Sequence, residues 1–508
     1  MGRSRNVLFI ILDQLRADAV FGGLGAGVAL PRMRGLAAEG VRFARHSSVA
    51  NPCGPSRASL LTGLYAMTHR SVRNGTPLAA HHPTLPRALR AGGVEPLLYG
   101  YSDTTLDPRG MAPADPALKS YETAMPGFTE VVAMRFDESL PWQGYLRAQG
   151  YDLPPYARFY EPVAAPGRPP RVDDPAFYAA AHSDTAYLTD RFLEDIAVRT
   201  LHPWCAALTY IRPHPPFVAP APYNRWVEPG VPPAPQRFAT PEAEAARHPF
   251  LGPAQAQAPA RRYVQGVEPF ADSPETHRAM RAVYLGLAAE VDAHLGRVLD
   301  WLEASGQARD TLVVLTSDHG EMLGDHWLWG KMSPFEPAWH VPLVIRDPDR
   351  PEAAGRVVEA LTEHVDLAPT ILDWLGAEVP AAMDGRSLLP LMGGAVPEDW
   401  RDHAVSELDF ADLEVPTPWQ RALGLAPEAC NLTILREARW KLVHFNGGLP
   451  PMLFDLAADP GEMTDLAGDP AHAGELLRLT RRVLDHRMRQ ADHALTGMQA
   501  TATGMIGR

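Results

Sequence analysis

Residues 51–63 read NPCGPSRASLLTG, and the rest of the chain is organised around them. Pro55 suits the first turn of a helix, because its missing N–H group has no intrahelical partner there. Cys53 would then lie at or just before the helix N-terminus, where free N–H groups and the helix dipole favour anionic groups. Arg57 adds a positive charge nearby. The stretch therefore predicts a cysteine in an electropositive setting at the start of a helix.

Cys53 has three interpretations. Most lone intracellular cysteines are buried structural thiols. Alternatively, the helix and the arginine would activate Cys53 as a thiolate nucleophile. Thirdly, residues 53–57 resemble the Cys-x-Pro-x-Arg signature of type I sulfatases, and residues 60–65, LLTGLY, are similar to the same family. In that family the cysteine is oxidised after translation to formylglycine, an aldehyde whose hydrate is the nucleophile. We favour this third interpretation, provided that metal ligands occur elsewhere in the chain.

Length and charge limit the class of protein. A chain of 508 residues is too long for one ordinary core, which favours two domains, one of them large. The net charge of −13 argues against non-specific nucleic-acid binding, which needs a basic face. The three cysteines are widely separated, so no disulfide framework or zinc spacing is present. We therefore expect a globular enzyme without a nucleic-acid partner.

The first apolar run, Val7–Leu12, is short, ends at Asp13 and lacks a small-residue cleavage site. It has the pattern of a central parallel strand buried on both faces, and not of a signal peptide or a membrane span. We therefore predict a cytoplasmic protein with no membrane partner.

Polar side chains follow several predicted strands at the ends where α/β sheets hold their ligands. Asp13 follows the first strand, His214 follows Trp204–Ile211, and Asp318 and His319 follow Thr311–Leu315. Carboxylate and imidazole ligands suit Mg²⁺, Ca²⁺ or Mn²⁺, and imidazole makes Ca²⁺ less favourable. The alternatives are a helix N-cap for Asp13 and a surface loop for His214.

Strands and helices alternate through most of the chain, which predicts an α/β domain over residues 1–390. Beyond it, short antiparallel strands at Asn431–Leu435, Trp440–His444 and Met452–Asp455 precede a final helix at Ala471–Ala491. This pattern predicts a smaller α+β domain over residues 391–508. Residues 107–180 are expected to be irregular.

The joint pattern resembles the sulfatase branch of the alkaline phosphatase superfamily over essentially the whole chain, nearest to phosphonate monoester hydrolases and related arylsulfatases. The residues that carry the resemblance are Val7–Asp18, Asn51–Tyr65, Asn74, Tyr101 with Asp107–Arg109, Arg212–Ala219, Ser317–Lys331 and Met452–Asp459. It implies an alkaline-phosphatase-like mixed central sheet with helices on both faces, and a smaller C-terminal α+β domain with a short antiparallel sheet.

The resemblance also implies a role for each site residue. One divalent metal ion (Mn²⁺, Mg²⁺ or Ca²⁺) would be held by Asp13, Asp318, His319 and the modified Cys53, with Gln14 beside them as a ligand or an orienting residue. Arg57 would hold the aldehyde hydrate, and Lys331, by default a solvated surface lysine, would bind a non-bridging oxygen of the ester. His214 would protonate the leaving-group oxygen, and Asn74 and Tyr101 would line the pocket.

Asp103 departs from the related phosphonate monoester hydrolases, which have a threonine at the aligned position. It would accept a proton from the hemiacetal, lie beside the metal ligands, or merely cap a turn. We therefore expect a hydrolase of sulfate monoesters, with hydrolysis of phosphonate monoesters or phosphodiesters by the same site as the alternative. A thiol enzyme or a non-catalytic metal-binding protein is the third possibility.

The expected partners follow from the same resemblance. A metal ion, Lys331 and Arg57 would outweigh the charges of Asp13 and Asp318, so the substrate should be a small, singly charged anionic ester. Maturation would need a formylglycine-generating enzyme. The polar tail Ala491–Arg508 is similar to tails that reach across subunits in related enzymes, which predicts a homodimer or homotetramer.

Overall fold

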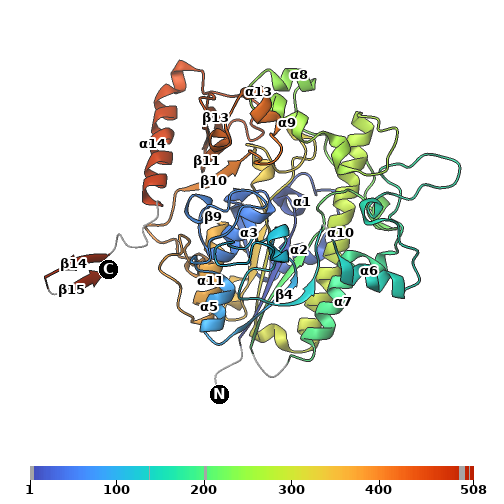
Figure 1. Cartoon of the computed structure of the whole chain (residues 1–508), viewed down its shortest axis with the longest axis horizontal. Coiled ribbons are helices and arrows are strands. Elements are labelled where there is room, and N and C mark those ends of the chain that lie inside the picture. Colours follow the sequence, from blue (N-terminus) through green and yellow to red (C-terminus); the bar gives the residue numbers. More distant parts are fainter. Residues whose placement is uncertain (1–4, 137, 200–202, 491–497, 503, 508) are drawn as a thin grey trace.

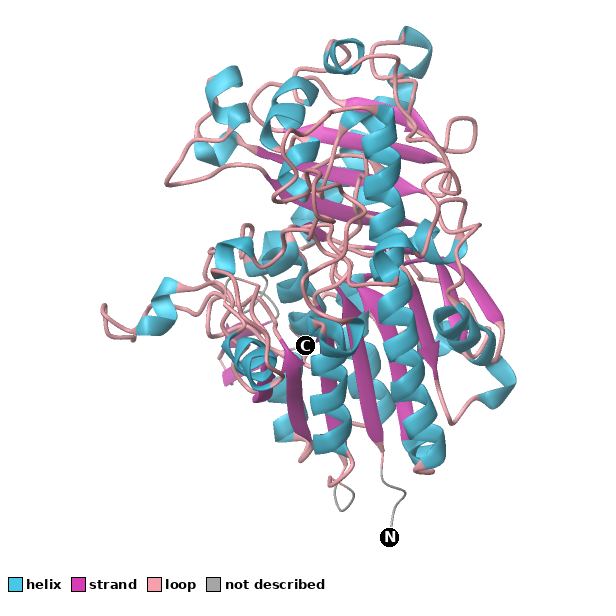
Figure 2. Ribbon diagram, turned by 90° about the vertical axis from the view of Figure 1, so that its right-hand side faces the viewer, coloured by secondary structure: helices cyan, strands magenta, loops and turns pink. Residues whose placement is uncertain are grey.

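The large sheet of the computed structural model is mixed and has eight strands in the order β5-β4-β6-β1-β7-β8-β2-β9 (Figures 1 and 2). The structure describes residues 5–136, 138–199, 203–490, 498–502 and 504–507. The strands are β1 Asn6–Leu12, β2 Val41–Ser47, β4 Glu95–Gly100, β5 Thr129–Ala133, β6 Trp204–Tyr210, β7 Thr311–Ser317, β8 Leu343–Arg346 and β9 Arg356–Glu363. Strand β8 alone runs antiparallel to its described neighbours β7 and β2. The predicted mixed central sheet is confirmed.

The centre of this sheet aligns the carboxyl ends of three parallel strands. Strand β1 lies between β6 and β7, and Leu12 pairs with Tyr210 on one side and Ser317 on the other. All seven residues of each of these strands are buried, as expected for strands covered on both faces. The residues that follow β1, β6 and β7 therefore emerge together at one edge.

Helices cover both faces, because successive side chains of β1 point to opposite sides. Leu8, Ile10 and Leu12 pack in one core with α2 (Pro31–Glu39), α7 (Asp184–Ile196) and α10 (Pro274–Ala304). Val7, Phe9 and Ile11 pack in the other with α3 (Cys53–Thr62), α5 (Leu85–Ala91) and α11 (Leu367–Leu375). The shorter helices are α1 Ala17–Phe21, α4 Ala66–His69, α6 Leu140–Ala148, α8 Pro241–Ala245, α9 Leu251–Gln257, α12 Leu389–Met392 and α13 Pro418–Leu423.

The small sheet has the order β13-β12-β11-β10-β3 and lies above the large sheet in Figure 2. Its strands are β3 Ala50–Asn51, β10 His403–Asp409, β11 Asn431–Glu437, β12 Trp440–Phe445 and β13 Met452–Asp455, and α14 (Ala473–Arg489) packs on it. Ala50 of β3 pairs with Glu407 of β10, so the strand that leads into Cys53 belongs to the small sheet. The C-terminal antiparallel sheet is confirmed, while the boundary at residue 390 stays a prediction.

Several elements differ from the sequence prediction. The segment 107–180, expected to be irregular, contains β5 and α6. Strand β5 lies at an edge and buries only one of its five residues, so it has neither an apolar run nor a clear alternation. Strands β9 and β10 were not predicted either.

Two further features concern partners. Among the described residues, no helix combines the length and the apolar composition needed to cross a bilayer. Part of the predicted tail forms a hairpin of β14 (Met498–Thr501) and β15 (Gly504–Gly507), which Figure 1 shows apart from the body of the molecule. The rest of the tail, residues 491–497, 503 and 508, lies outside the described residues.

Candidate active site

Four predicted ligands meet at the carboxyl edge of the large sheet. Asp13, Cys53, Asp318 and His319 are all buried, and one ligand atom of each lies within 4.8 Å of those of the others. Asp13 follows β1 and Asp318 follows β7, at the same level of two paired strands. Cys53 is the first residue of α3, so its side chain enters the site from a helix N-terminus.

The loop after β1 is held against Asp318. Gln14 N and His319 N donate to Asp318 Oδ1 over 3.0 Å and 2.9 Å. Gln14 has φ +71°, a left-handed conformation that is unusual for a residue with a side chain. This conformation turns the chain sharply after Asp13, and the hydrogen bond from Gln14 N to Asp318 holds the turn at the site.

The ring of His319 is oriented as a metal ligand would be. Its Nδ1 donates to Gly320 O over 3.0 Å, which leaves Nε2 unprotonated and facing Cys53 Sγ at 3.2 Å. Burial, and then Lys331, hold the pKa of His319 well below its usual value. A Cβ on residue 320 would lie 2.0 Å from Pro337 O, so only glycine allows this close approach.

Cys53 lies among polar groups. The thiols of Cys205 and Cys430 belong to hydrophobic clusters, whereas Cys53 Sγ lies 3.0 Å from Lys331 Nζ. This environment argues against a structural packing thiol. Burial, and then the charge of Asp13, raise the pKa of the Cys53 thiol well above its usual value, which argues against an activated thiolate.

Arg57 is fully buried and joins the two carboxylates. Its Nε donates to Asp318 Oδ2 over 3.0 Å, and its Nη2 donates to Asp13 Oδ2 over 3.2 Å. The guanidinium lies 4.0 Å from the centre of the Tyr101 ring, and the Tyr101 hydroxyl donates to Asp13 Oδ2 over 2.6 Å. Tyr101, predicted to line the pocket, is only 2% exposed and holds a carboxylate in place.

The electrostatics of this cluster fit a divalent cation. Burial by itself would raise the pKa of Asp13, but His214, Lys331 and Arg57 outweigh it and hold this pKa below the usual range. Burial, and then the charge of Asp13, raise the pKa of Asp318 to about 7. Two facing carboxylates with an imidazole nitrogen are a donor set for Mg²⁺ or Mn²⁺, whose charge would offset their repulsion. These residues therefore fit the metal that the sequence predicts.

Asp103 lies at the edge of the cluster. It is 6% exposed, with φ +47°, and its Oδ2 is 3.7 Å from Arg57 Nε. Its Oδ1 is buried without a hydrogen-bond partner among the described residues. Burial, opposed by Arg57, raises the pKa of Asp103 well above its usual value. The structure thus places Asp103 against the arginine that binds both predicted metal ligands.

Lys331 connects three predicted site residues. Its Nζ donates to Gln14 Oε1 over 2.9 Å and to Cys53 Sγ, and it contacts His214 Nε2 at 3.1 Å. His214 Nδ1 donates to Pro215 O over 2.6 Å, so Nε2 accepts from the ammonium group. Burial, and then Lys331, lower the pKa of His214 to about 3. The Lys331–His214 pair lies at a cavity of about 370 Å³.

Asn74 is the most exposed of the predicted residues. Its Oδ1 accepts a hydrogen bond from Gly54 N over 2.9 Å. A Cβ on Gly54 would lie 3.0 Å from this oxygen, so glycine permits the contact. Asn74 therefore supports the first turn of α3 beside Cys53.

Glu321 is a functional candidate that the sequence did not reveal. It is fully buried, its Oε1 accepts from Leu323 N over 2.9 Å, and its Oε2 accepts from Gln14 Nε2. This contact fixes which end of the Gln14 amide faces Lys331. A glutamate within the polar run after β7 has the same pattern as a solvated one, so the sequence carried no signal for this role.

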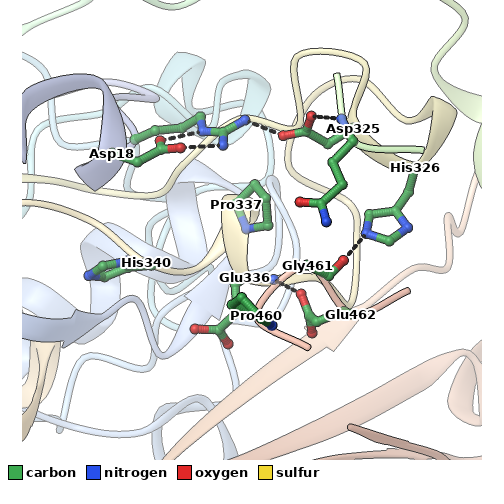
Figure 3. A pocket seen from close by; sticks show the side chains of 11 residues that line it. Asp18, Asp325, His326, Glu336, Pro337, His340, Pro460, Gly461 and Glu462 are labelled. Atoms are coloured by element: carbon green, nitrogen blue, oxygen red, sulfur yellow. Dashed lines mark hydrogen bonds and ion pairs between the residues drawn. The ribbon is translucent and has the colours of Figure 1, made fainter. Parts of the chain in front are cut away.

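A second cavity, of about 210 Å³, contains none of the predicted site residues (Figure 3). Its acidic residues already have partners: Asp18 and Asp325 each pair with Arg16 at 2.7 Å. Figure 3 shows His326 facing the carbonyl of Gly461, to which its Nε2 lies at 3.0 Å. The paired charges indicate a structural role for this cavity.

Comparison with known proteins agrees with this geometry. The family described as sulfatase matches residues 5–377, and the C-terminal family of N-sulphoglucosamine sulphohydrolase matches residues 324–489. The multifunctional alkaline phosphatase superfamily protein PehA of Trinickia caryophylli is 40% identical, over 99% of both chains. A choline-sulfatase of Rhizobium meliloti is 26% identical, over 92% of this chain and 83% of its own.

Two solved structures are similar over 99% of both chains. A phosphonate monoester hydrolase from Silicibacter pomeroyi is 52% identical, with a TM-score of 0.96. A phosphonate monoester hydrolase of Agrobacterium radiobacter is 42% identical, with a TM-score of 0.93. The similarity therefore covers both sheets and the segments that carry the site.

Proposed function

This chain belongs to the sulfatase family of the alkaline phosphatase superfamily, and from that premise we propose that it hydrolyses phosphonate monoesters and phosphodiesters. The observation that carries the proposal is the convergence of Asp13, Cys53, Asp318 and His319 beside the Lys331–His214 pair. The sequence placed sulfate monoesters first. The two phosphonate monoester hydrolase structures support the alternative better, so we reverse that order.

The residues at the site fit two groups that the family implies. Asp13, Asp318, His319 and the modified Cys53 would hold a divalent cation, with the Gln14 amide beside them. Such a cation lowers the pKa of a bound hydroxyl group and offsets the charge of the transferring group. Formylglycine at position 53 would supply the nucleophile as the hydrate of its aldehyde.

The remaining chemistry falls to side chains of this chain. Arg57 keeps Asp13 and Asp318 in fixed positions through buried hydrogen bonds. Lys331 Nζ would bind a non-bridging oxygen of the ester and stabilise the charge that develops there. His214 Nε2 faces the same cavity and accepts a hydrogen bond from Lys331, so it would first take up a proton from this ammonium group or from water and then donate it to the departing oxygen.

Two measurements test the proposal. Mass spectrometry of the tryptic peptide 46–57 distinguishes an aldehyde at Cys53 from a thiol. The kcat/KM values for 4-nitrophenyl esters of phenylphosphonate, sulfate and phosphate then rank the substrates, with the phosphonate expected first and the dianionic phosphate monoester last. Absence of phosphonate hydrolysis by aldehyde-bearing protein would overturn the proposal.

Sulfate monoester hydrolysis is the second candidate because of Asp103. In its ionised form, the carboxylate of Asp103 against Arg57 would add negative charge beside the transferring group, which favours singly charged esters over dianionic ones. Asp103→Asn should therefore raise the ratio of phosphate monoester to sulfate turnover, measured as kcat/KM. An unchanged ratio would leave Asp103 without an electrostatic role in substrate choice.

We further propose a homodimer or homotetramer that forms through the C-terminal segment, and maturation by a formylglycine-generating enzyme. The β14–β15 hairpin pairs with itself and lies apart from the body in Figure 1. Light scattering on the full chain and on a chain lacking residues 496–508 tests the assembly. A monomer in both cases would contradict it.

A further inference from the structure

The cavity beside His214 and Lys331 extends well beyond the groups that act on the ester. Gln14, His214 and Lys331 form its inner end. Its outer lining comes from Phe136, from Met332, from Gln257 at the end of α9 and from the segment that follows α9, including Arg262, Tyr263 and Gln265. A proton delivered from His214 reaches the leaving-group oxygen, so the rest of the leaving group must occupy this outer part.

Two aromatic side chains, Phe136 and Tyr263, form part of the walls of the outer part. Phe136 packs edge-on against the His214 ring, with centroids 5.2 Å apart. The Tyr263 ring lies 5.9 Å from Phe217 and 6.0 Å from Trp329, and a Cβ on Gly330 would come within 2.1 Å of its hydroxyl. Such fixed aromatic surfaces suit a planar apolar group, because stacking adds to the burial of apolar area.

The charge of the cavity is positive at both ends. None of its described lining residues is a carboxylate, and Lys331 and Arg262 are its cations. Arg262 Nη1 donates to Gln257 O over 2.6 Å, which leaves further N–H groups of the guanidinium for a ligand. No ion pair of Arg262 occurs within the described part of this acidic chain. An anionic group at the outer end would meet a cation there.

We propose that the natural leaving group is a planar apolar group, such as an aryl ring, that carries an acidic substituent bound by Arg262. This inference rests on the proposed function, because it assumes that the scissile ester lies at His214 and Lys331. The ring would lie between Phe136 and Tyr263, and a carboxylate or sulfonate at its far end would accept hydrogen bonds from Arg262.

Matched substrates test the charge. The probes are the 4-carboxyphenyl and the 4-carbamoylphenyl esters of phenylphosphonate, which have similar shape and differ in charge. The wild-type enzyme should prefer the carboxylate, and Arg262→Met should lower the ratio of the two kcat/KM values about fivefold, mainly through KM. High salt should reduce the wild-type preference, since Arg262 is exposed.

Arg261 supplies the control. It is an exposed neighbour that does not line the cavity, so Arg261→Met should keep the wild-type ratio. A wild-type ratio near one, or a ratio that Arg262→Met leaves unchanged, would overturn the inference while leaving the proposed function intact. Failure of the wild-type enzyme on every phosphonate and sulfate ester would overturn both.

Discussion

At the scale of single residues, the two buried cations of the site have different tasks. Arg57 is bound by Asp13, Asp318 and Tyr101 and has no exposed surface, so it acts on the geometry of the carboxylates. Lys331 reaches Cys53, Gln14 and His214 and borders the cavity, so its ammonium group meets the substrate side. One cation fixes the predicted ligands, and the other is available for catalysis.

Substitution of Cys53 should abolish turnover and spare the fold. Cys53→Ala is expected to lose all measurable ester hydrolysis, because no aldehyde can form, and to keep its melting temperature within a few degrees. Cys53→Ser should lose almost as much activity, because a serine supplies a nucleophile but no route for product release. Assays and thermal melts of both variants check this; more than trace activity in Cys53→Ala contradicts the formylglycine mechanism.

Glu321 should act as a positioning residue for the Gln14 amide. Glu321→Gln replaces one acceptor oxygen with a donor that faces Gln14 Nε2 or a backbone N–H, so the amide should lose its fixed orientation. Partners of metal ligands typically contribute about 10–100-fold to metal affinity, and we expect a loss of that order. Titration of metal-free protein with Mn²⁺ by calorimetry measures it.

The exchanged pair provides the control for this prediction. In the double variant Gln14→Glu with Glu321→Gln, the carboxylate and the amide change places and the contact can form again. Mn²⁺ affinity should recover in part relative to Glu321→Gln. Equal affinity in wild type and Glu321→Gln would contradict a role for Glu321 in orienting Gln14.

At the scale of elements, α7 and α10 place ionisable side chains beside the loop that carries His214. Arg212, just after β6, donates from Nη1 to His214 O and pairs with Asp184 of α7 at 3.0 Å. Glu290 of α10 lies close enough to Asp184 and Arg212 to be affected by their charges. Both Glu290 oxygens are buried, and the nearby Ser183 hydroxyl is a described side chain that interacts with them. Arg212 thus joins the loop that carries His214 to α7, and Glu290 of α10 lies near this ion pair on the same face of the large sheet.

Glu290 predicts a decline in stability as pH rises from about 4.5 to about 8. Burial, and then the charge of Asp184, raise the pKa of Glu290 from 4.5 to about 8. A raised pKa in the folded state means that folding favours the protonated form, so this contribution is full below pH 4.5 and is lost as pH rises through about 8. Glu290→Gln should reduce the loss of unfolding free energy between pH 5 and 9 by roughly 4 kcal/mol.

Denaturant unfolding at a series of pH values measures this effect. Glu303→Gln is the matched control, since Glu303 is an exposed residue of the same helix and should leave the pH dependence unchanged. A Glu290→Gln variant with the same pH dependence as wild type would contradict the assignment of a protonated Glu290.

At the scale of the whole molecule, the site lies where the two sheets join. Strand β3 pairs with β10 of the small sheet, and Cys53 begins α3 only two residues after Asn51. Asn51 Nδ2 donates to Lys331 O over 3.1 Å, so the connection between the sheets also restrains the backbone of Lys331. A substitution in the small sheet can therefore shift Cys53 or Lys331, because β3 pairs with that sheet and contacts both residues' segments.

Metal removal should lower the stability of the whole chain, because the cation offsets the repulsion between Asp13 and Asp318. A ligand present at 100 times its Kd stabilises the folded state by about 2.7 kcal/mol. Dialysis against a chelator should lower the melting temperature of the wild type, and Mn²⁺ should restore it. Asp318→Asn, which removes a carboxylate ligand, should respond much less; an equal response would place the stabilising ion elsewhere.

The sequence by itself determined the large α/β fold and the edge of the sheet at which the chemistry would lie. Val7–Leu12 and Thr311–Leu315 are continuous apolar runs, and burial on both faces leaves a parallel central strand as their consistent interpretation. Polar residues that follow such strands must emerge at the same edge, so Asp13, Asp318 and His319 could be grouped without coordinates. The resemblance at residues 53–57 then added the cysteine.

Only the tertiary structure decided which side chains support that group. Tyr101 holds Asp13, Glu321 holds Gln14 from 307 positions away in the chain, and Arg262 borders the leaving-group cavity. The edge strand β5 and the entry of β3 into the small sheet were also beyond the sequence. Local periodicity reports how deeply a segment is buried, but a contact between distant segments depends on how the elements pack, and no local pattern of residues records it.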